Sequence, residues 1–163
     1  MRYTDSPTAE VEVAISAPVE RVWELVSDIN LPARFSSEFR GAEWLDGGPA
    51  LGARFVGRNS HSAIGEWQTT CTLTRYEAQR AFEWAVGDLE QPAARWRFEL
   101  EPTADGVRLR QWAQMGPGRS GLTPAIERMP EKEERIVARR LEEWRTNMAA
   151  NLQGIKGLAE AGA

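Results

Sequence analysis

The chain has 163 residues, and its 24 acidic and 20 basic side chains give a formal net charge of −4. One cysteine and one histidine exclude a disulfide framework and argue against a zinc site, and no basic stripe points to nucleic acid. The sequence has no signal peptide and no apolar run of about 20 residues that would span a membrane. We therefore expect one domain over residues 1–163, in the reducing cytoplasm, without metal, cofactor or nucleic-acid partner.

The first part of the chain predicts a strand followed by helix. Residues 10–16 alternate between apolar and polar side chains, which is typical of a half-buried strand. The next apolar residues have the i, i+3, i+4, i+7 spacing of a short amphipathic helix: Val19, Val22, Trp23 and Val26. Pro18 suits the first turn of this helix, and Pro32 disfavours its continuation beyond Asn30.

The middle of the chain predicts six further strands separated by turn signals. Short connections between them favour antiparallel neighbours, and alternation gives each strand one apolar face. Only for the first of the six are both faces equally plausible. The strands are expected at 38–45, 52–59, 66–77, 80–86, 94–101 and 107–115.

The last part of the chain predicts helix. Residues 123–130 suit one or two helical turns, and a long amphipathic helix of about 29 residues follows from Glu131. Gly154 and Gly157 should weaken its far end by up to about 1 kcal/mol each relative to alanine. Its apolar stripe consists of Val137, Leu141, Trp144, Met148, Leu152, Ile155 and Ala159.

This order of elements, with the stretches ISAPVERVWELVSDI, GARFVGRN and GEW, resembles the START-like (helix-grip, SRPBCC) superfamily, and within it the bacterial polyketide cyclase/dehydrase and lipid-transport family. The resemblance runs from about Glu10 to Glu160. It implies an α+β helix-grip fold: a seven-stranded curved antiparallel sheet wrapped around the long C-terminal helix, with two short helices after the first strand. It also implies a deep, mostly apolar cavity between sheet and helix that holds a hydrophobic small molecule.

The inward faces of the strands and the long helix supply the candidate ligand-binding residues. The alternative is that the aromatic side chains are plain core and that the polar ones bond to their neighbours. The turns at 57–65, 87–93 and 116–122 should share one end of the sheet, which the resemblance makes the cavity mouth, and their glycines suit mobile lids. The candidates are Phe55, Asn59, Trp67, Thr69, Phe82, Trp84, Trp96, Phe98, Leu109, Gln111, Met115, Leu141 and Trp144.

His61 is the one candidate for acid–base catalysis near neutral pH, with Asn59 and Gln111 as possible helpers. No nucleophile, base and orienting group stand out together in the sequence. The bland interpretation of His61 is therefore an exposed turn residue at the rim of the pocket. Arg139 or Arg140 on the long helix could reach the pocket, although a solvated helix face is the favoured interpretation for both.

Three functions fit these observations. The first is a protein that binds a polyketide-, lipid- or aromatic-type molecule, as a monomer or homodimer. The second is a polyketide cyclase, aromatase or dehydratase that acts on such a molecule. The third is a protein-interaction module, which exposed aromatic side chains such as Trp44 and Trp112 would support.

Overall fold

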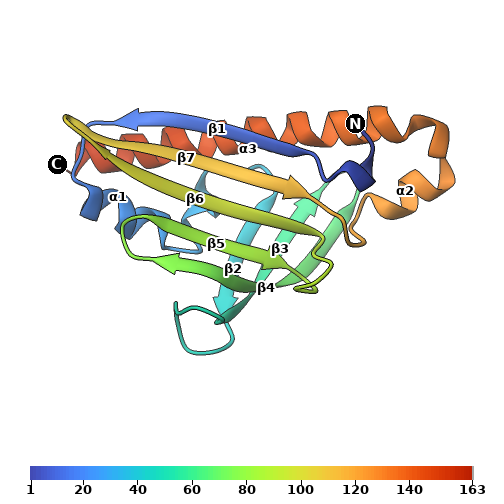
Figure 1. Cartoon of the computed structure of the whole chain (residues 1–163), viewed down its shortest axis with the longest axis horizontal. Coiled ribbons are helices and arrows are strands. Elements are labelled where there is room, and N and C mark those ends of the chain that lie inside the picture. The colour runs from blue at the N-terminus through green and yellow to red at the C-terminus, as the bar shows by residue number, and fades with distance from the viewer. Residues whose placement is uncertain (163) are drawn as a thin grey trace.

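The computed structural model describes residues 1–162, and its centre is one antiparallel sheet with the strand order β1-β7-β6-β5-β4-β3-β2 (Figure 1). From β2 to β7 each strand pairs with the next one in the chain, and β1 pairs with β7, so β1 and β2 are the two edges of the sheet. The strands are β1 Thr8–Ile15, β2 Phe39–Trp44, β3 Arg54–His61, β4 Gly65–Glu77, β5 Ala81–Val86, β6 Ala94–Thr103 and β7 Gly106–Met115.

The helices complete the predicted α+β helix-grip arrangement, which the structure confirms. The long helix α3 runs beside β1 across the concave side of the sheet, with α1 near one of its ends and α2 near the other (Figure 1). The second short helix after β1 is a 3₁₀ turn, Leu31–Arg34, and two further 3₁₀ turns lie at Tyr3–Asp5 and Pro130–Lys132. None of the helices in the described part is long and apolar enough to cross a membrane. The α-helices are α1 Val19–Val26, α2 Thr123–Arg128 and α3 Glu133–Ala161.

The sheet bends at two irregularities, which allow it to wrap around α3. The register shifts between Leu73 and Arg75 in β4, and between Phe39 and Gly41 in β2. Bulges of this kind increase local twist and bend the strand that carries them. The bulge in β2 also places both Phe39 and Ala42 against the interior, which explains why the sequence left the buried face of this strand undecided.

Apolar side chains form two separate clusters along α3. The α1-end cluster includes Phe82, Phe98 and Leu152, and the α2-end cluster includes Met115 and Trp144. All seven residues of the predicted apolar stripe of α3 are buried, which confirms the helical spacing. The two clusters leave the middle of the molecule to the pocket described below.

Gly154 has a packing role that the sequence analysis did not anticipate. A Cβ atom at this position would overlap the ring of Phe35, whereas a Cβ atom at Gly157 would meet nothing within 4 Å. Gly154 therefore allows the segment after α1 to pack directly on the helix. The glycine that weakens α3 locally fixes the position of residues 35–38.

Candidate functional site

A pocket of about 570 Å³ lies between the inner face of the sheet and α3. It separates the α1-end cluster from the α2-end cluster, because members of both line it. Eleven of the thirteen candidate ligand-binding residues are among its lining: Phe55, Asn59, Trp67, Thr69, Phe82, Trp84, Trp96, Phe98, Gln111, Met115 and Trp144. Leu109 and Leu141 are buried in the two clusters and do not line it.

Aromatic rings form most of the apolar wall. Trp84 lies edge-on to Phe55 at 5.9 Å between ring centroids and tilted against Phe98 at 6.2 Å. Trp96 of β6 meets Trp144 of α3 at 4.7 Å, so this pair joins sheet and helix. Rings in such contacts gain about 0.5–1.5 kcal/mol per pair beyond the area they bury, which keeps the wall in a defined shape.

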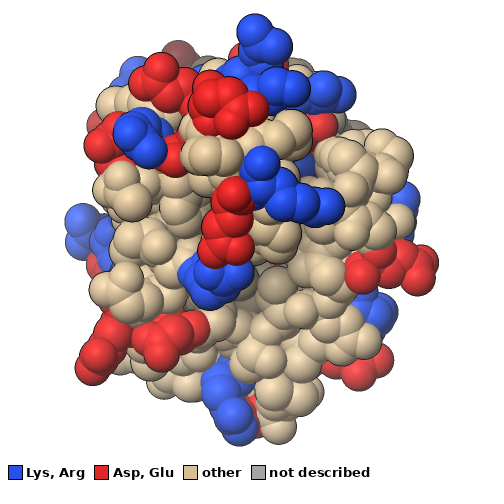
Figure 2. Space-filling view, turned by 90° about the vertical axis from the view of Figure 1, so that its right-hand side faces the viewer, with Lys and Arg blue, Asp and Glu red and all other residues tan. Residues whose placement is uncertain are grey.

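Three loops meet at one end of the pocket, shown in Figure 2, where acidic and basic side chains are interspersed among broad uncharged areas. Ile64, Ala93 and Leu122, one from each predicted mouth loop, line the pocket. Two of the three loops, 87–93 and 116–122, are joined by hydrogen bonds from Gly116 N–H to the Ala93 carbonyl and from Gly118 N–H to the Pro92 carbonyl, both 2.8 Å long. A Cβ atom at Gly118 would overlap the backbone of Gln91, so this glycine allows close contact between two loops.

The predicted turn at 57–65 is much shorter than expected. Strand β3 continues to His61 and β4 begins at Gly65, which leaves only residues 62–64 in the turn. Gly65 has φ +89°, and Ile64 N–H donates to the carbonyl of His61 (3.2 Å). His61 is therefore a strand residue with 14 % of its side chain exposed, and the interpretation as an exposed turn histidine is wrong.

A chain of charged side chains, here called the ionic network, crosses from this turn to α3 and on to the segment before β2. His61 Nε2 lies 2.9 Å from Glu143 Oε2, and Arg140 donates to Glu143 Oε1 (3.1 Å). Arg140 also donates to both oxygens of Glu38, at 2.7 and 2.8 Å. Asn147 Nδ2 donates to Glu38 Oε2 (3.1 Å). The favoured interpretation of Arg140 as a residue of the solvated face is wrong, because it lines the pocket with only 11 % of its side chain exposed.

The hydrogen bonds of His61 fix its tautomer and its role. The backbone N–H of Ala63 donates to Nδ1 (2.9 Å), so the ring proton is assigned to Nε2, from which it reaches Glu143. His61 does not line the pocket, and no hydrogen bond within residues 1–162 joins it to Asn59 or Gln111. The three predicted catalytic candidates are thus not assembled into one group; His61 fastens the turn to the helix.

The ionic network also determines the protonation of Glu143. Burial alone would raise its pKa, but hydrogen bonds from His61 and Arg140, together with the charge of Arg140, hold the pKa below its ordinary value. Glu38, His61 and Glu143 bring ligand atoms within 4.8 Å of one another, a grouping that can hold a metal ion and that the sequence analysis missed. The guanidinium of Arg140 bonds to both carboxylates and supplies positive charge at this place itself.

Deeper in the pocket, Gln111 of β7 and Asn151 of α3 form what we call the amide pair. Asn151 Nδ2 donates to Gln111 Oε1 (3.2 Å), and both residues line the pocket. Asn151 is 3 % exposed and Gln111 7 %. Asn151 Oδ1 is buried and accepts no hydrogen bond from any described residue. An unsatisfied buried acceptor costs about 1–3 kcal/mol, and among the described lining residues this is the one fully buried side-chain acceptor without a partner.

Cys71 lies in the same wall and behaves as a small apolar residue. Its side chain is buried, and burial raises the pKa of the thiol to about 12, against a smaller opposing effect of the contact with Thr69 Oγ1 (3.7 Å). The thiol is therefore protonated at neutral pH and is not a nucleophile there.

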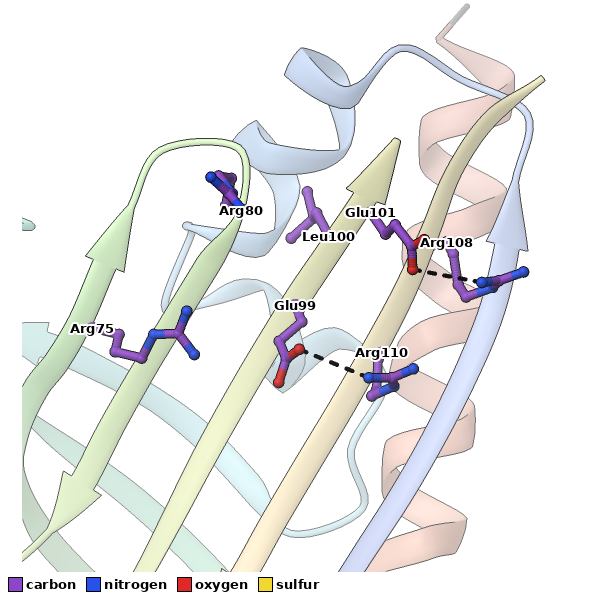
Figure 3. A pocket seen from close by; sticks show the side chains of 7 residues that line it. All are labelled: Arg75, Arg80, Glu99, Leu100, Glu101, Arg108 and Arg110. Carbon is purple, nitrogen blue, oxygen red and sulfur yellow. Dashed lines mark ion pairs between the residues drawn. The ribbon is translucent and has the colours of Figure 1, made fainter. Parts of the chain in front are cut away.

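A second, smaller pocket of about 240 Å³ lies on the outer face of the sheet and differs in chemistry (Figure 3). Its lining is charged, and the arginines face glutamates: Arg108 lies 3.5 Å from Glu101, and Arg110 lies 3.8 Å from Glu99. The outer face also covers its tryptophan, because the guanidinium of Arg97 lies 4.1 Å from the ring centroid of Trp112. The ring of Trp44 packs on that of Phe55 at 5.5 Å between centroids. Trp44 and Trp112 therefore form no exposed aromatic patch.

The family assignment rests on a comparison with known families. Residues 6–154 match the family described as "Polyketide cyclase / dehydrase and lipid transport". The chain belongs to this family. The match covers nearly the whole chain, as the resemblance from Glu10 to Glu160 predicted. No curated protein matches the chain.

Solved structures agree with the family and the fold. A polyketide-cyclase-like protein from Corynebacterium glutamicum is 28 % identical, with a TM-score of 0.69 over 95 % of this chain and 92 % of that one. The chain also matches half of the di-domain ARO/CYC protein BexL of the BE-7585A biosynthetic pathway, at 14 % identity and a TM-score of 0.72, over 94 % of this chain and 50 % of that one. The di-domain ARO/CYC protein StfQ of the steffimycin biosynthetic pathway is 12 % identical, with a TM-score of 0.71 over 98 % of this chain and 54 % of that one. At these identities the last two show the fold alone.

Within this polyketide cyclase/dehydrase and lipid-transport fold, sequence reasoning missed the polar side of α3. Its residues recur at helical spacing, three or four apart, just beside the apolar stripe: Arg140, Glu143, Asn147 and Asn151. Such a polar stripe next to a buried one was a usable signal. Glu38 had no comparable signal, because it lies in an irregular segment before β2.

Proposed function

We propose that the protein binds a hydrophobic small molecule of polyketide, lipid or aromatic type in the pocket between the sheet and α3. The observation that carries the proposal is the pocket itself: about 570 Å³, with aromatic and aliphatic side chains as the larger part of its wall and polar side chains placed among them. Ligand sites in proteins generally have this size and this composition. The family, whose description includes lipid transport, agrees with such a ligand.

Filling the pocket from its own wall tests this proposal. Thr69 points into the pocket from β4, whereas Thr72 lies on the opposite face of the same strand and does not line it. We expect Thr69→Phe to weaken binding of the dye 1-anilinonaphthalene-8-sulfonate strongly, and Thr72→Phe to leave it unchanged. Thermal unfolding of both variants verifies that they are folded.

Two results would count against a ligand pocket. One is equal dye binding by folded Thr69→Phe and Thr72→Phe, because the dye would then bind elsewhere. The other is a wild-type protein that binds no dye and carries no adduct in native mass spectrometry after purification. A released adduct would identify the ligand chemistry directly.

The second candidate function is catalysis of the cyclase, aromatase or dehydratase type. It is favoured by the position of Arg140 in the pocket wall, where the guanidinium could polarise a bound carbonyl. Asn59 also lines the pocket and, within residues 1–162, its side chain makes no hydrogen bond, so it is free to orient a substrate.

Asn59→Ala is the sharper test of catalysis, because His61→Ala would also release Glu143 and disturb the fold. If the protein is an enzyme, we expect Asn59→Ala to lower turnover of a released or supplied polyketide while thermal stability stays constant. Turnover at the wild-type rate would remove Asn59 from the mechanism.

A further inference from the structure

The amide pair stands where an apolar contact would complete the core. Gln111 follows Leu109 of the α1-end cluster by two positions and precedes Ala113 of the α2-end cluster by two. On α3, Asn151 lies between Met148 of one cluster and Leu152 of the other. Two polar side chains at this place cost stability unless their hydrogen-bonding groups find partners.

The pair keeps unused hydrogen-bonding capacity on both sides. Each side chain has one carbonyl and one NH₂ group, and their mutual bond uses the Nδ2 of Asn151 and the Oε1 of Gln111. Within residues 1–162, Asn151 Oδ1 accepts nothing and Gln111 Nε2 donates nothing. Exchanging the two ends of both amides gives the same result, one unused carbonyl and one unused NH₂, so the conclusion does not depend on which way the amides are assigned.

The unused groups lie at the pocket. Gln111 and Asn151 both belong to its lining. Asn151 Oδ1 is shielded in the present rotamer, but the terminal torsion of asparagine has a broad energy well, so a ligand would have to turn this oxygen toward the pocket, which gives up the bond from Asn151 Nδ2 to Gln111 Oε1. One acceptor and one donor can then meet a single ligand group.

Ligand groups differ in how well they meet this pair. A carbonyl or ether oxygen accepts from Gln111 but gives Asn151 nothing, and a hydrocarbon leaves both unused. A hydroxyl group donates to one amide and accepts from the other. Resting on the proposed function, we propose that the amide pair binds a hydroxyl group, so that the ligand is a hydrophobic phenol or alcohol.

Three matched naphthalenes test the proposal by isothermal titration calorimetry. Naphthalene has no polar group, 2-methoxynaphthalene adds an acceptor only, and 2-naphthol adds an acceptor and a donor. We expect the wild-type protein to bind 2-naphthol about tenfold more tightly than 2-methoxynaphthalene, because the hydroxyl makes one hydrogen bond more than the ether and one net bond of ordinary strength allows a factor of this size. The double variant Gln111→Met/Asn151→Leu, of similar shape, should lose the preference for 2-naphthol over 2-methoxynaphthalene.

Each other outcome has a definite meaning. If the wild type and the double variant rank the three compounds alike, the amide pair is structural and the proposal is wrong. If the wild type binds both oxygen-containing compounds equally, Gln111 acts as a donor alone and the hydroxyl assignment is wrong. Failure of the wild type to bind naphthalene itself contradicts the proposed function, not just this refinement of it. The wild-type preference between the two oxygen compounds decides the matter even if the double variant does not fold.

Discussion

Two groups of polar residues in the pocket wall, the ionic network and the amide pair, differ in how completely their hydrogen bonds are satisfied. In the ionic network, each carboxylate oxygen of Glu38 and Glu143 accepts at least one hydrogen bond, and Arg140 serves both residues. In the amide pair, one bond joins the two residues and Asn151 Oδ1 remains unsatisfied. The hydrogen bonds of the ionic network join the turn after β3, the segment before β2 and α3. The amide pair keeps one acceptor, Asn151 Oδ1, and one donor, Gln111 Nε2, that a ligand can use.

The largest expected effect comes from breaking the ionic network at Arg140. Arg140→Met removes the guanidinium from Glu38 and Glu143 and leaves them with Asn147 and His61 as partners, so we expect it to lower the free energy of unfolding by about 3–5 kcal/mol. Urea denaturation measures the change. Arg139→Met, the same substitution at the exposed neighbouring residue, should stay within about 0.5 kcal/mol of the wild type. Equal losses in the two variants would mean that the network does not hold the fold together.

The next effect concerns the segment that carries Glu38. Gly154→Ala forces a methyl group against Phe35, and we expect it to destabilise the protein by about 1–3 kcal/mol despite the better helix propensity of alanine. Gly157→Ala has open space and should stabilise it by up to about 1 kcal/mol. Thermal unfolding of the two variants gives the comparison. A gain in stability from both substitutions would show that Phe35 is not fixed on α3.

A smaller effect is expected on the pH dependence of stability. Because the folded state lowers the pKa of Glu143, its ionised form contributes stability above the unfolded pKa of about 4.3, and this contribution is lost as the pH falls through the folded pKa. Stability should therefore fall more steeply between about pH 5 and about pH 3 in the wild type than in Glu143→Gln. Glu142→Gln, on the exposed neighbour, should keep the wild-type slope. Equal slopes in all three proteins would remove Glu143 from the acid response.

The smallest effect on stability is expected at the amide pair. Replacing both partners by apolar side chains of similar shape removes an unsatisfied acceptor without leaving another. The free energy of unfolding of Gln111→Met/Asn151→Leu should therefore lie no more than about 1 kcal/mol below that of the wild type, or should exceed it. Urea denaturation under the conditions used for Arg140→Met makes the two regions directly comparable. A loss as large as that of Arg140→Met would give the amide pair a structural role and abolish the contrast.

The sequence predicts the fold well because its signals are local. Alternation in the strands and the three- and four-residue spacing from Val137 to Ala159 depend only on which face a side chain takes. The same parity placed Phe55, Trp84 and Phe98 on the inner face, where they line the pocket. Parity gives no depth along a strand or helix, which is why Leu109 and Leu141 were included although they lie in closed core.

The polar part of the site was less predictable, because it depends on contacts between distant segments. His61 and Glu143 are 82 residues apart, and Glu38 and Arg140 are 102 apart. No pattern in a single sequence shows that these residues are in contact. The sequence analysis therefore interpreted Arg140 as part of a solvated helix face and His61 as an exposed turn residue. The glycines of the 116–122 loop are ambiguous in a similar way, since close packing on another backbone, as at Gly118, and flexibility favour the same residue.

The most direct test of a ligand pocket between the sheet and α3 uses the four methionines of the chain. Met115 and Met148 line the pocket and are 1 % exposed, whereas Met1 and Met129 are 72 % and 37 % exposed and lie outside its lining. In protein labelled with methyl-¹³C-methionine and titrated with naphthalene, we predict that the methyl signals of Met115 and Met148 shift while those of Met1 and Met129 stay in place. Unchanged signals from Met115 and Met148 at saturating probe, or shifts confined to Met1 and Met129, would contradict the account.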